Sequence, residues 1–238
     1  MSGGNQPQQT LRIRFTKAGK VRFVSHRDVA RLFERALRKL RVPVAYSEGF
    51  SPRPKLSFGL ALSVGHESDA EYLDLALASP IDVEALPAQL SEALPPGLDV
   101  SDAVVLAPGS PSLQQAVVRC DWHMELLGQN RDEIEQTSAQ LLAADEILLE
   151  RERKGKTAVV NVRPAIVSIE IVGPTDNGVA IRVQLATEAV SLRPNEFVGL
   201  FDALEGRVRR THQWMIVDQA RLEPIPGPST RPLLEAAE

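Results

Sequence analysis

Residues 11–59, LRIRFTKAGKVRFVSHRDVARLFERALRKLRVPVAYSEGFSPRPKLSFG, are the stretch from which the fold is best read. They hold 13 of the 27 lysine and arginine residues but only three of the 31 acidic residues, so their net charge is +10 and that of the remaining chain is −14. A local field of this size suggests an anionic partner such as nucleic acid. The alternative is a helix that arginine merely makes soluble.

A surface helix is predicted to begin after Ser25, because Ser25 to Asp28 form a capping-box variant with Asp in place of the usual Glu. Apolar residues then recur at helical spacing and form one stripe: Val29, Leu32, Phe33, Ala36, Leu37 and Leu40. At about 100° per residue, one cluster of arginines falls within about 80° on the opposite face, with a fifth beside it. These arginines are Arg27, Arg31, Arg38 and Arg41, flanked by Arg35. Such a one-sided arrangement favours contact with phosphate groups.

The loop Gly49–Lys55 is the second informative segment. Its two prolines remove backbone donors and fix φ, so the loop is expected to be pre-shaped. Arg53 and Lys55 would then be presented in a defined geometry, with Phe50 available to stack on a base. Alternatively, the loop is a rigid connection whose Phe50 fills the core.

His26 is predicted to lie on the rim of the apolar stripe, beside Phe33 and Leu37. A structural hydrogen bond and a role as general base would both suit this position. For a lone histidine the structural role is the more common one.

The order of elements predicts an α+β protein with two ferredoxin-like (split βαβ) domains in tandem, each with an antiparallel sheet. In the first half, strands are expected at 11–15, 21–24, 42–47, 56–62, 71–77 and 98–106, with helices from Ser25 and at 82–94. In the second half, strands are expected at 116–127, 146–152, 158–172, 178–186 and 209–217, with helices at 131–144 and 194–204.

Five segments follow from this order and from composition. They are a disordered lead-in (1–10), an N-terminal domain with the basic helix (11–107), a linker (108–114), a C-terminal domain (115–222) and a disordered, proline-rich tail (223–238).

The amino-acid composition excludes several classes of function. No apolar run approaches 18 residues, so no membrane partner is expected. The lead-in lacks the features of a signal peptide, and Cys120 is the single cysteine, which fits the reducing cytoplasm. His66, Glu67 and Glu71 resemble metal ligands but are expected to be solvated. No metal site, no cofactor and no DNA specificity is predicted.

Three sequence motifs resemble those of a bacterial radical-SAM-linked family of unknown function. They lie in Phe23–Arg38, Ala45–Phe58 and Gly65–Asp74, and they match F-x-S-H-x-D, S-x-G-F-N-P-H-P-K and S-x-x-E-Y patterns. Ser51 and Arg53 depart from the pattern, which has Asn and His there. The resemblance implies a stand-alone form of a domain that is fused elsewhere to a cobalamin-binding-type radical SAM protein, and an RNA-facing accessory role. With one cysteine, this chain cannot itself hold the cluster of such an enzyme.

Three hypotheses remain open. In the first, rRNA or tRNA docks on a surface made by Arg27, Arg31, Arg35, Arg38, Phe50, Arg53 and Lys55, in partnership with a radical SAM enzyme. In the second, the same surface grips an acidic face of that enzyme without RNA, because arginine suits carboxylate as well as phosphate. In the third, the chain is a metal-independent RNA endonuclease that uses His26 as general base. Catalysis by the chain alone is the least expected.

Overall fold

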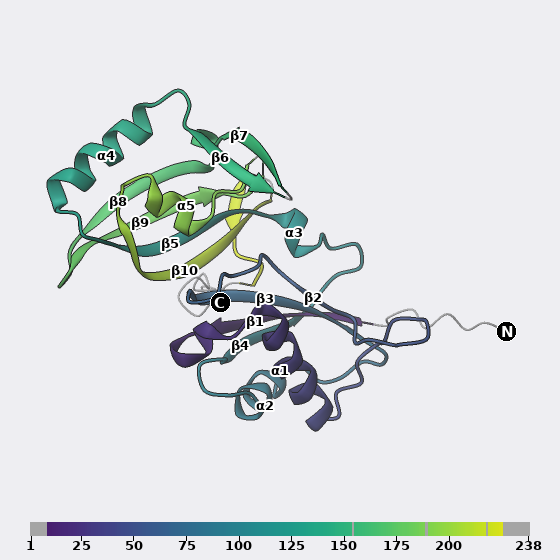
Figure 1. Cartoon of the computed structure of the whole chain (residues 1–238). Coiled ribbons are helices and arrows are strands. Elements are labelled where there is room, and N and C mark those ends of the chain that lie inside the picture. Colours follow the sequence, from purple (N-terminus) through teal and green to yellow (C-terminus); the bar gives the residue numbers. More distant parts are fainter. Residues whose placement is uncertain (1–8, 154, 189, 218, 226–238) are drawn as a thin grey trace, which may run out of the picture. The chain divides into compact units, whose positions relative to one another are not determined.

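The structure is a computed structural model that describes residues 9–153, 155–188, 190–217 and 219–225. It is an α+β protein whose strands pair mostly antiparallel, which confirms this part of the prediction. The chain divides into two compact units. The first comprises the residues up to Ala116 together with those from Met215 onward, and the second comprises Val117–Trp214. Figure 1 follows the chain through both.

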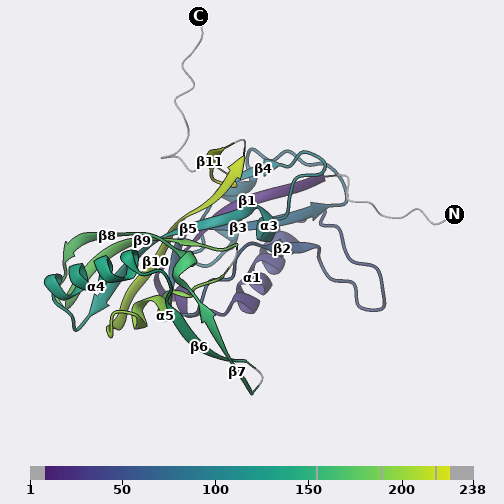
Figure 2. The same ribbon diagram turned by 90° about the horizontal axis from the view of Figure 1, so that it is seen from above.

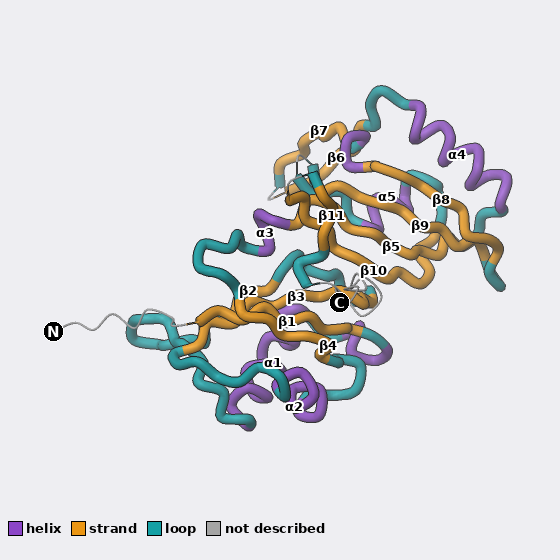
Figure 3. The backbone as a smooth tube through the Cα atoms, turned by 180° about the vertical axis from the view of Figure 1, so that it is seen from behind, coloured by secondary structure: helices purple, strands orange, loops and turns teal. Residues whose placement is uncertain are grey.

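The first unit is built from one sheet and two main helices. Its elements are β1 (Gln9–Lys17), the 3₁₀-helix η1 (Gly19–Phe23), α1 (His26–Lys39), β2 (Leu56–Phe58), β3 (Glu67–Leu77), α2 (Leu86–Ala93), β4 (Val100–Val105), α3 (Leu113–Ala116) and β11 (Ala220–Leu222). The strand order is β4-β1-β3-β2, and every neighbouring pair in it is antiparallel. Both α1 and α2 cover the same face of this sheet (Figure 3).

The core of the first unit lies between that face and the helices. Alternate residues of β1 and β3 point into it because side chains of a strand alternate between its two faces: Leu11, Ile13, Phe15, Leu73, Leu75 and Leu77. Phe33 of α1 is fully buried, and its ring centroid lies 4.8 Å from that of Phe15 and 6.0 Å from that of Phe58. The apolar stripe predicted for the helix therefore packs on the sheet.

Hydrogen bonds define both ends of α1, and the one at its N-terminus was predicted from the sequence. Ser25 is the N-cap, and its hydroxyl oxygen accepts from the backbone N–H of Asp28 at 3.2 Å. At the other end the N–H of Val42 donates to the carbonyl of Leu37 at 3.0 Å, and the N–H of Arg41 donates to Arg38 at 3.1 Å. These two bonds form the Schellman arrangement that closes a helix. The predicted helix is confirmed.

Three local predictions for the first half are wrong. Residues 21–24 were expected to be a strand, but Gly19, with φ of 65°, turns the chain into η1. Residues 42–47 form only isolated bridges, because this segment leads directly into the proline-containing loop. The predicted lead-in extended to residue 10, yet β1 begins at Gln9, which pairs with Leu77.

The other face of this sheet holds buried ion pairs. Arg12 donates to both carboxylate oxygens of Asp74, at 2.8 and 2.9 Å, from the strand position directly opposite. Arg14 lies 3.2 and 3.4 Å from the two carboxylate oxygens of Glu223. The hydroxyl of Tyr72 donates to the carbonyl of Ile225 at 3.3 Å. Burial raises the pKa of Tyr72, so the phenol is neutral there.

The packing on this face corrects two predicted boundaries. Residues 223–225 are buried, so they are not part of a disordered tail, and the rest of that predicted tail (226–238) lies outside the described residues. The C-terminal domain was predicted to run to residue 222, but the second compact unit ends at Trp214. The physical reason is that β11 pairs with the end of β10 and leads to Glu223, which pairs with Arg14.

The second unit repeats the order of strands and helices with a hairpin added. Its elements are β5 (Val117–Leu127), α4 (Arg131–Ala143), β6 (Leu148–Arg153), β7 (Lys156–Asn161), the 3₁₀-helix η2 (Arg163–Ala165), β8 (Ile166–Pro174), β9 (Gly178–Ala186), α5 (Pro194–Gly199) and β10 (Leu204–Val217), which crosses the unit boundary. The strand order is β10-β5-β9-β8, and β6 and β7 pair as a separate hairpin. The single strand predicted at 158–172 is wrong, because η2 interrupts it.

Within the described part of the chain, no helix has both the length and the apolar character that a membrane span requires.

Candidate nucleic-acid interface

The arginines predicted for the outer face of α1 are all exposed. Arg27, Arg31, Arg35 and Arg38 are open to solvent, whereas the four buried residues of the helix form the opposite stripe: Val29, Phe33, Ala36 and Leu37. The helix spans 14 residues, which corresponds to about 21 Å of length. The exposed arginines therefore form one basic strip along the helix, which we call the α1 basic face.

Two acids of α1, Asp28 and Glu34, lie near the arginines of the α1 basic face, and Asp28 has defined partners. Asp28 accepts a hydrogen bond from the Ser25 hydroxyl at 2.7 Å and forms an ion pair with Arg31 at 2.9 Å. The Ser25 hydrogen bond, together with the charges of Arg31 and Arg27, lowers the pKa of Asp28 below its usual value. Asp28 is therefore ionised at neutral pH, and it partly neutralises the N-terminal end of the strip.

Fewer basic side chains of residues 11–59 reach the surface than the sequence suggested. Arg12, Arg14 and Lys17 are buried, and Arg22 lies 3.6 Å from the carboxylate of Glu67, so these four cations do not contribute freely to the surface field. The exposed basic residues of residues 11–59 are Lys20, Arg27, Arg31, Arg35, Arg38, Lys39, Arg41, Arg53 and Lys55. Most of them belong to α1 and the segment that follows it.

The loop after α1 is held in a defined shape by backbone hydrogen bonds. The N–H of Ser47 donates to the carbonyl of Arg53 at 2.8 Å, and the N–H of Lys55 donates to the carbonyl of Ala45 at 2.8 Å. The hydroxyl oxygen of Ser47 also accepts from the N–H of Arg53 at 3.0 Å. Figure 2 shows this segment as a long excursion between α1 and β2.

Phe50 lies at the tip of this excursion, fully exposed. The alternative in which Phe50 fills the core is therefore wrong. Arg53 and Lys55 are exposed as well. The loop thus presents an aromatic ring and two cations to solvent, which is the combination found where proteins stack and neutralise single-stranded nucleic acid.

A second exposed aromatic ring precedes α1, and sequence reasoning missed it. Phe23 is 61% exposed, and the guanidinium carbon of Arg22 lies 4.5 Å from its ring centroid. The residue was assigned to a strand, whereas the turn of η1 directs it outward. An Arg-Phe pair directly before a basic helix was the available signal, since such pairs form cation–π contacts.

His26 stands at the N-terminal end of α1, exposed to solvent, and it packs edge-on against Phe58 with the ring centroids 5.0 Å apart. Its ring contact is Phe58 of β2, whereas the helical spacing predicted Phe33 and Leu37 beside it.

His66, Glu67 and Glu71 are buried, which corrects the expectation that they are solvated. Glu67 accepts a hydrogen bond from the N–H of Gly19 at 2.9 Å and so supports the turn before η1. Among the described residues, no group of three or more His, Cys, Asp and Glu side chains is arranged to hold a metal ion.

The family described as "Uncharacterized protein conserved in bacteria (DUF2344)" matches residues 10–194, which include α1, the loop and most of the second unit. No curated protein matches the chain.

Two solved assemblies resemble the chain in structure. The crystal structure of a Cbf5–Nop10–Gar1 complex has a TM-score of 0.50 and 14% identity, over 87% of this chain and 49% of that chain. The structure of an H/ACA RNP bound to a substrate RNA containing 2′-deoxyuridine has a TM-score of 0.45 and 13% identity, over 88% of this chain and 48% of that chain. This chain thus spans about half the length of each matched chain. At such low identity the first likeness concerns the fold alone.

Proposed function

The chain belongs to the family of uncharacterized proteins conserved in bacteria (DUF2344), and within that family we propose that it is an RNA-binding accessory protein. The observation that carries this proposal is the α1 basic face, in which four exposed arginines lie opposite a fully packed apolar stripe. Phosphate neutralisation by such a strip supplies most of the affinity of sequence-independent nucleic-acid binding.

The fold supports the proposal at a coarser level. Each unit has its first and third strands side by side, flanked by the fourth and the second. We infer that both units are ferredoxin-like, because this order with two intervening helices is the split βαβ arrangement. The architecture hosts many functions, so the argument for RNA rests on the α1 basic face and the loop.

We further propose that the RNA is rRNA or tRNA and that the chain works beside a cobalamin-binding-type radical SAM enzyme in its modification. The resemblance of Phe23–Arg38, Ala45–Phe58 and Gly65–Asp74 to the radical-SAM-linked family motivates this part. Co-purification from the host, with and without complete RNA digestion, tests it. An enzyme that is recovered only while RNA is intact supports a shared RNA. A complex that survives digestion, from a chain with no affinity for free RNA, would instead establish the scaffold role.

Filter binding of small RNA at several salt concentrations tests the central claim. Log affinity should fall linearly with log salt concentration, and Arg35→Gln combined with Arg38→Gln should reduce the slope by roughly 0.7 for each phosphate that the variant no longer neutralises. The matched control is Arg131→Gln, an exposed arginine on α4 that forms an ion pair with Glu135 at 2.6 Å. Equal slopes for the double variant and the control would overturn the proposal.

The same RNA samples test the nuclease alternative. Incubation in EDTA should leave them intact, because the ring of His26 packs against Phe58, which suits a structural role for this histidine. Cleavage that persists in EDTA and disappears in His26→Ala would restore that alternative.

A further inference from the structure

Exposed aromatic side chains gather around α1. The eleven Phe, Tyr and Trp residues of the chain all lie in the part that the structure describes. Three of them are exposed: Phe23 at 61%, Tyr46 at 43% and Phe50 fully. The other eight are buried or half-buried. All three exposed rings therefore belong to the segments directly before and after α1.

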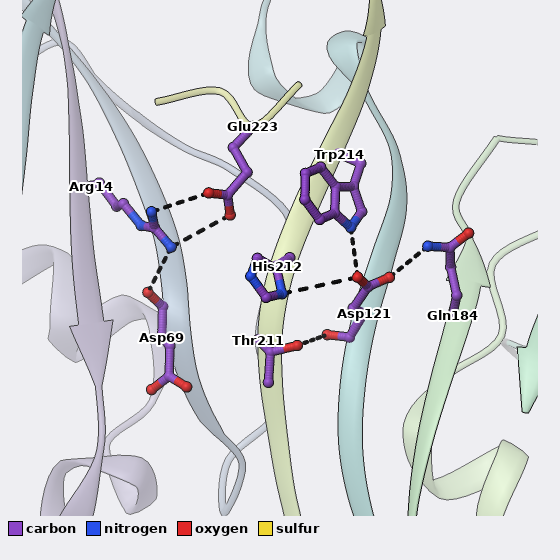
Figure 4. A network of polar contacts seen from close by, with 8 residues as sticks. All are labelled: Arg14, Asp69, Asp121, Gln184, Thr211, His212, Trp214 and Glu223. Atoms are coloured by element: carbon purple, nitrogen blue, oxygen red, sulfur yellow. Dashed lines mark hydrogen bonds and ion pairs between the residues drawn. The ribbon is translucent and has the colours of Figure 1, made fainter. Parts of the chain in front are cut away.

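Burial accounts for aromatic side chains elsewhere in the chain. Trp214, for example, is buried, and its indole nitrogen donates to the carboxylate of Asp121 at 2.8 Å (Figure 4). Its ring also stacks on that of His212, with the ring centroids 5.1 Å apart. The area that the three exposed rings leave in water contributes nothing of this kind to stability. Their position around α1 therefore needs an explanation other than the fold.

Phe23 lies at the N-terminal end of α1. It belongs to η1 and precedes His26, the first residue of the helix, by three positions. The ring of His26 packs on Phe58, which lies opposite Leu73 of β3, so this end of α1 is at the level of Leu73 on the sheet. The guanidinium carbon of Arg22 lies 4.5 Å from the ring centroid of Phe23, and the ring is nevertheless 61% exposed.

Tyr46 and Phe50 lie beyond the C-terminal end of α1, in the loop that leads to β2. The N–H of Ala45 donates to the carbonyl of Ala76 at 2.8 Å, which holds the base of this loop on β3. Ala76 follows Leu73 by three residues, which is about 10 Å along a strand. The α1 basic face therefore runs between one exposed ring at its first end and two at its other end.

The charges between these rings favour an anionic ligand after every acid of the segment is counted. Residues 23–55 carry eight lysine and arginine side chains, all exposed, and three acids, so their net charge is +5. The acids are Asp28, Glu34 and Glu48. Asp28 pairs with Arg31 at 2.9 Å, and both side chains are more than half exposed, so this pair is weak.

We propose, on the basis of the RNA-binding function proposed above, that the ligand of the α1 basic face is an unpaired RNA segment. Its phosphates lie along the arginines, and bases at its two ends stack on Phe23 and on Tyr46 or Phe50. In an RNA duplex the faces of the bases cover one another, so only unpaired bases can lie on an aromatic ring. Because α1 is about 21 Å long, the segment comprises roughly four nucleotides or more.

Fluorescence anisotropy with the full-length protein tests this inference. The three labelled probes are a single-stranded dodecauridylate, the same strand paired with dodeca-adenylate, and an abasic ribose-phosphate strand of equal length. A surface that contacts phosphates alone would prefer the duplex, because its charge density is higher. Stacking predicts the opposite order, with the single strand bound about tenfold or more tighter than either of the other two probes.

Variants without a change of charge separate stacking from phosphate contact. Phe23→Ala combined with Tyr46→Ala should weaken binding of the single strand by about fivefold or more and leave the salt dependence of binding unchanged. Phe23→Tyr combined with Tyr46→Phe keeps both rings and should retain the affinity. The matched control is Leu204→Ala, which shortens an exposed apolar side chain of the second unit. All of these side chains are exposed, so the urea denaturation midpoint should not change.

The outcomes distinguish this inference from the proposed function. Equal affinity for the single strand and the duplex overturns the inference, as does unchanged affinity in the Phe23→Ala, Tyr46→Ala variant. If the Arg35→Gln, Arg38→Gln variant still shows a reduced salt slope in that case, the RNA-binding function stands without stacking. Failure of all three probes to bind removes both.

Discussion

Arg41 adopts a left-handed backbone conformation, with φ of 55°, at the position after α1 where glycine is usual. This conformation costs a residue with a side chain about 1 kcal/mol relative to glycine. We expect Arg41→Gly to raise the free energy of unfolding by up to about that amount and to weaken RNA binding, because the exposed Arg41 extends the α1 basic face. Urea denaturation and filter binding measure the two effects. RNA affinity that is unchanged in Arg41→Gly would exclude Arg41 from the interface.

His123 makes stability depend on pH. The pKa of His123 is lowered in the folded protein. As the pH falls below the ordinary value of 6.5, the unfolded chain therefore binds more protons than the folded protein does, and the free energy of unfolding decreases. The contribution is complete above pH 6.5 and is lost as the pH falls toward the lowered value. Denaturation midpoints at about pH 7.5 and about pH 5.5 should therefore differ less for His123→Gln than for the natural sequence. A larger difference in the variant would contradict this assignment.

Among the structural elements, the loop between α1 and β2 has two ends that are held by backbone hydrogen bonds and a tip that is exposed. Phe50→Ala should leave the free energy of unfolding nearly unchanged, because the ring is fully exposed. Binding of single-stranded RNA should weaken by about 1–3 kcal/mol if one base stacks on Phe50. Phe58→Ala is the contrasting variant, since Phe58 packs against Phe15 and Phe33 and its removal should destabilise the fold. Fluorescence anisotropy with a labelled oligonucleotide, beside urea denaturation, distinguishes the two. Loss of stability in Phe50→Ala would show that the tip is packed.

At the scale of the whole molecule, the residues from Met215 onward belong to the first unit, although they follow the second unit in the sequence. Glu223 is 209 residues from Arg14 in sequence, and their ion pair is buried. Glu223→Ala should lower the free energy of unfolding by about 3–5 kcal/mol, because it leaves the Arg14 guanidinium buried without its carboxylate. Chemical denaturation measures the loss, and Glu84→Ala, an exposed acid of the same unit, serves as the control. Equal stability of the two variants would mean that Arg14 finds solvent or another partner.

Features that depend on neighbouring residues could be predicted from the amino-acid sequence. The Ser25 cap, the apolar stripe and the exposed arginines of α1 were all predicted, because helical hydrogen bonds and helix faces are set within a few positions. The pre-shaped loop followed from its prolines in the same way. The 3₁₀-helix η1 was missed, since Val21–Val24 alternates as a strand would.

Which charges reach the surface, by contrast, depends on tertiary packing. Arg12 and Arg14 look as basic in the sequence as Arg35 and Arg38, yet the first two are buried against Asp74 and Glu223. The neighbouring positions of His123 and Arg182 could not be predicted either, because sheet register brings them together from two strands. The backbone N–H and C=O groups of a strand bond to other strands on both sides. Its neighbours therefore depend on segments that are distant in the sequence, which local sequence does not specify.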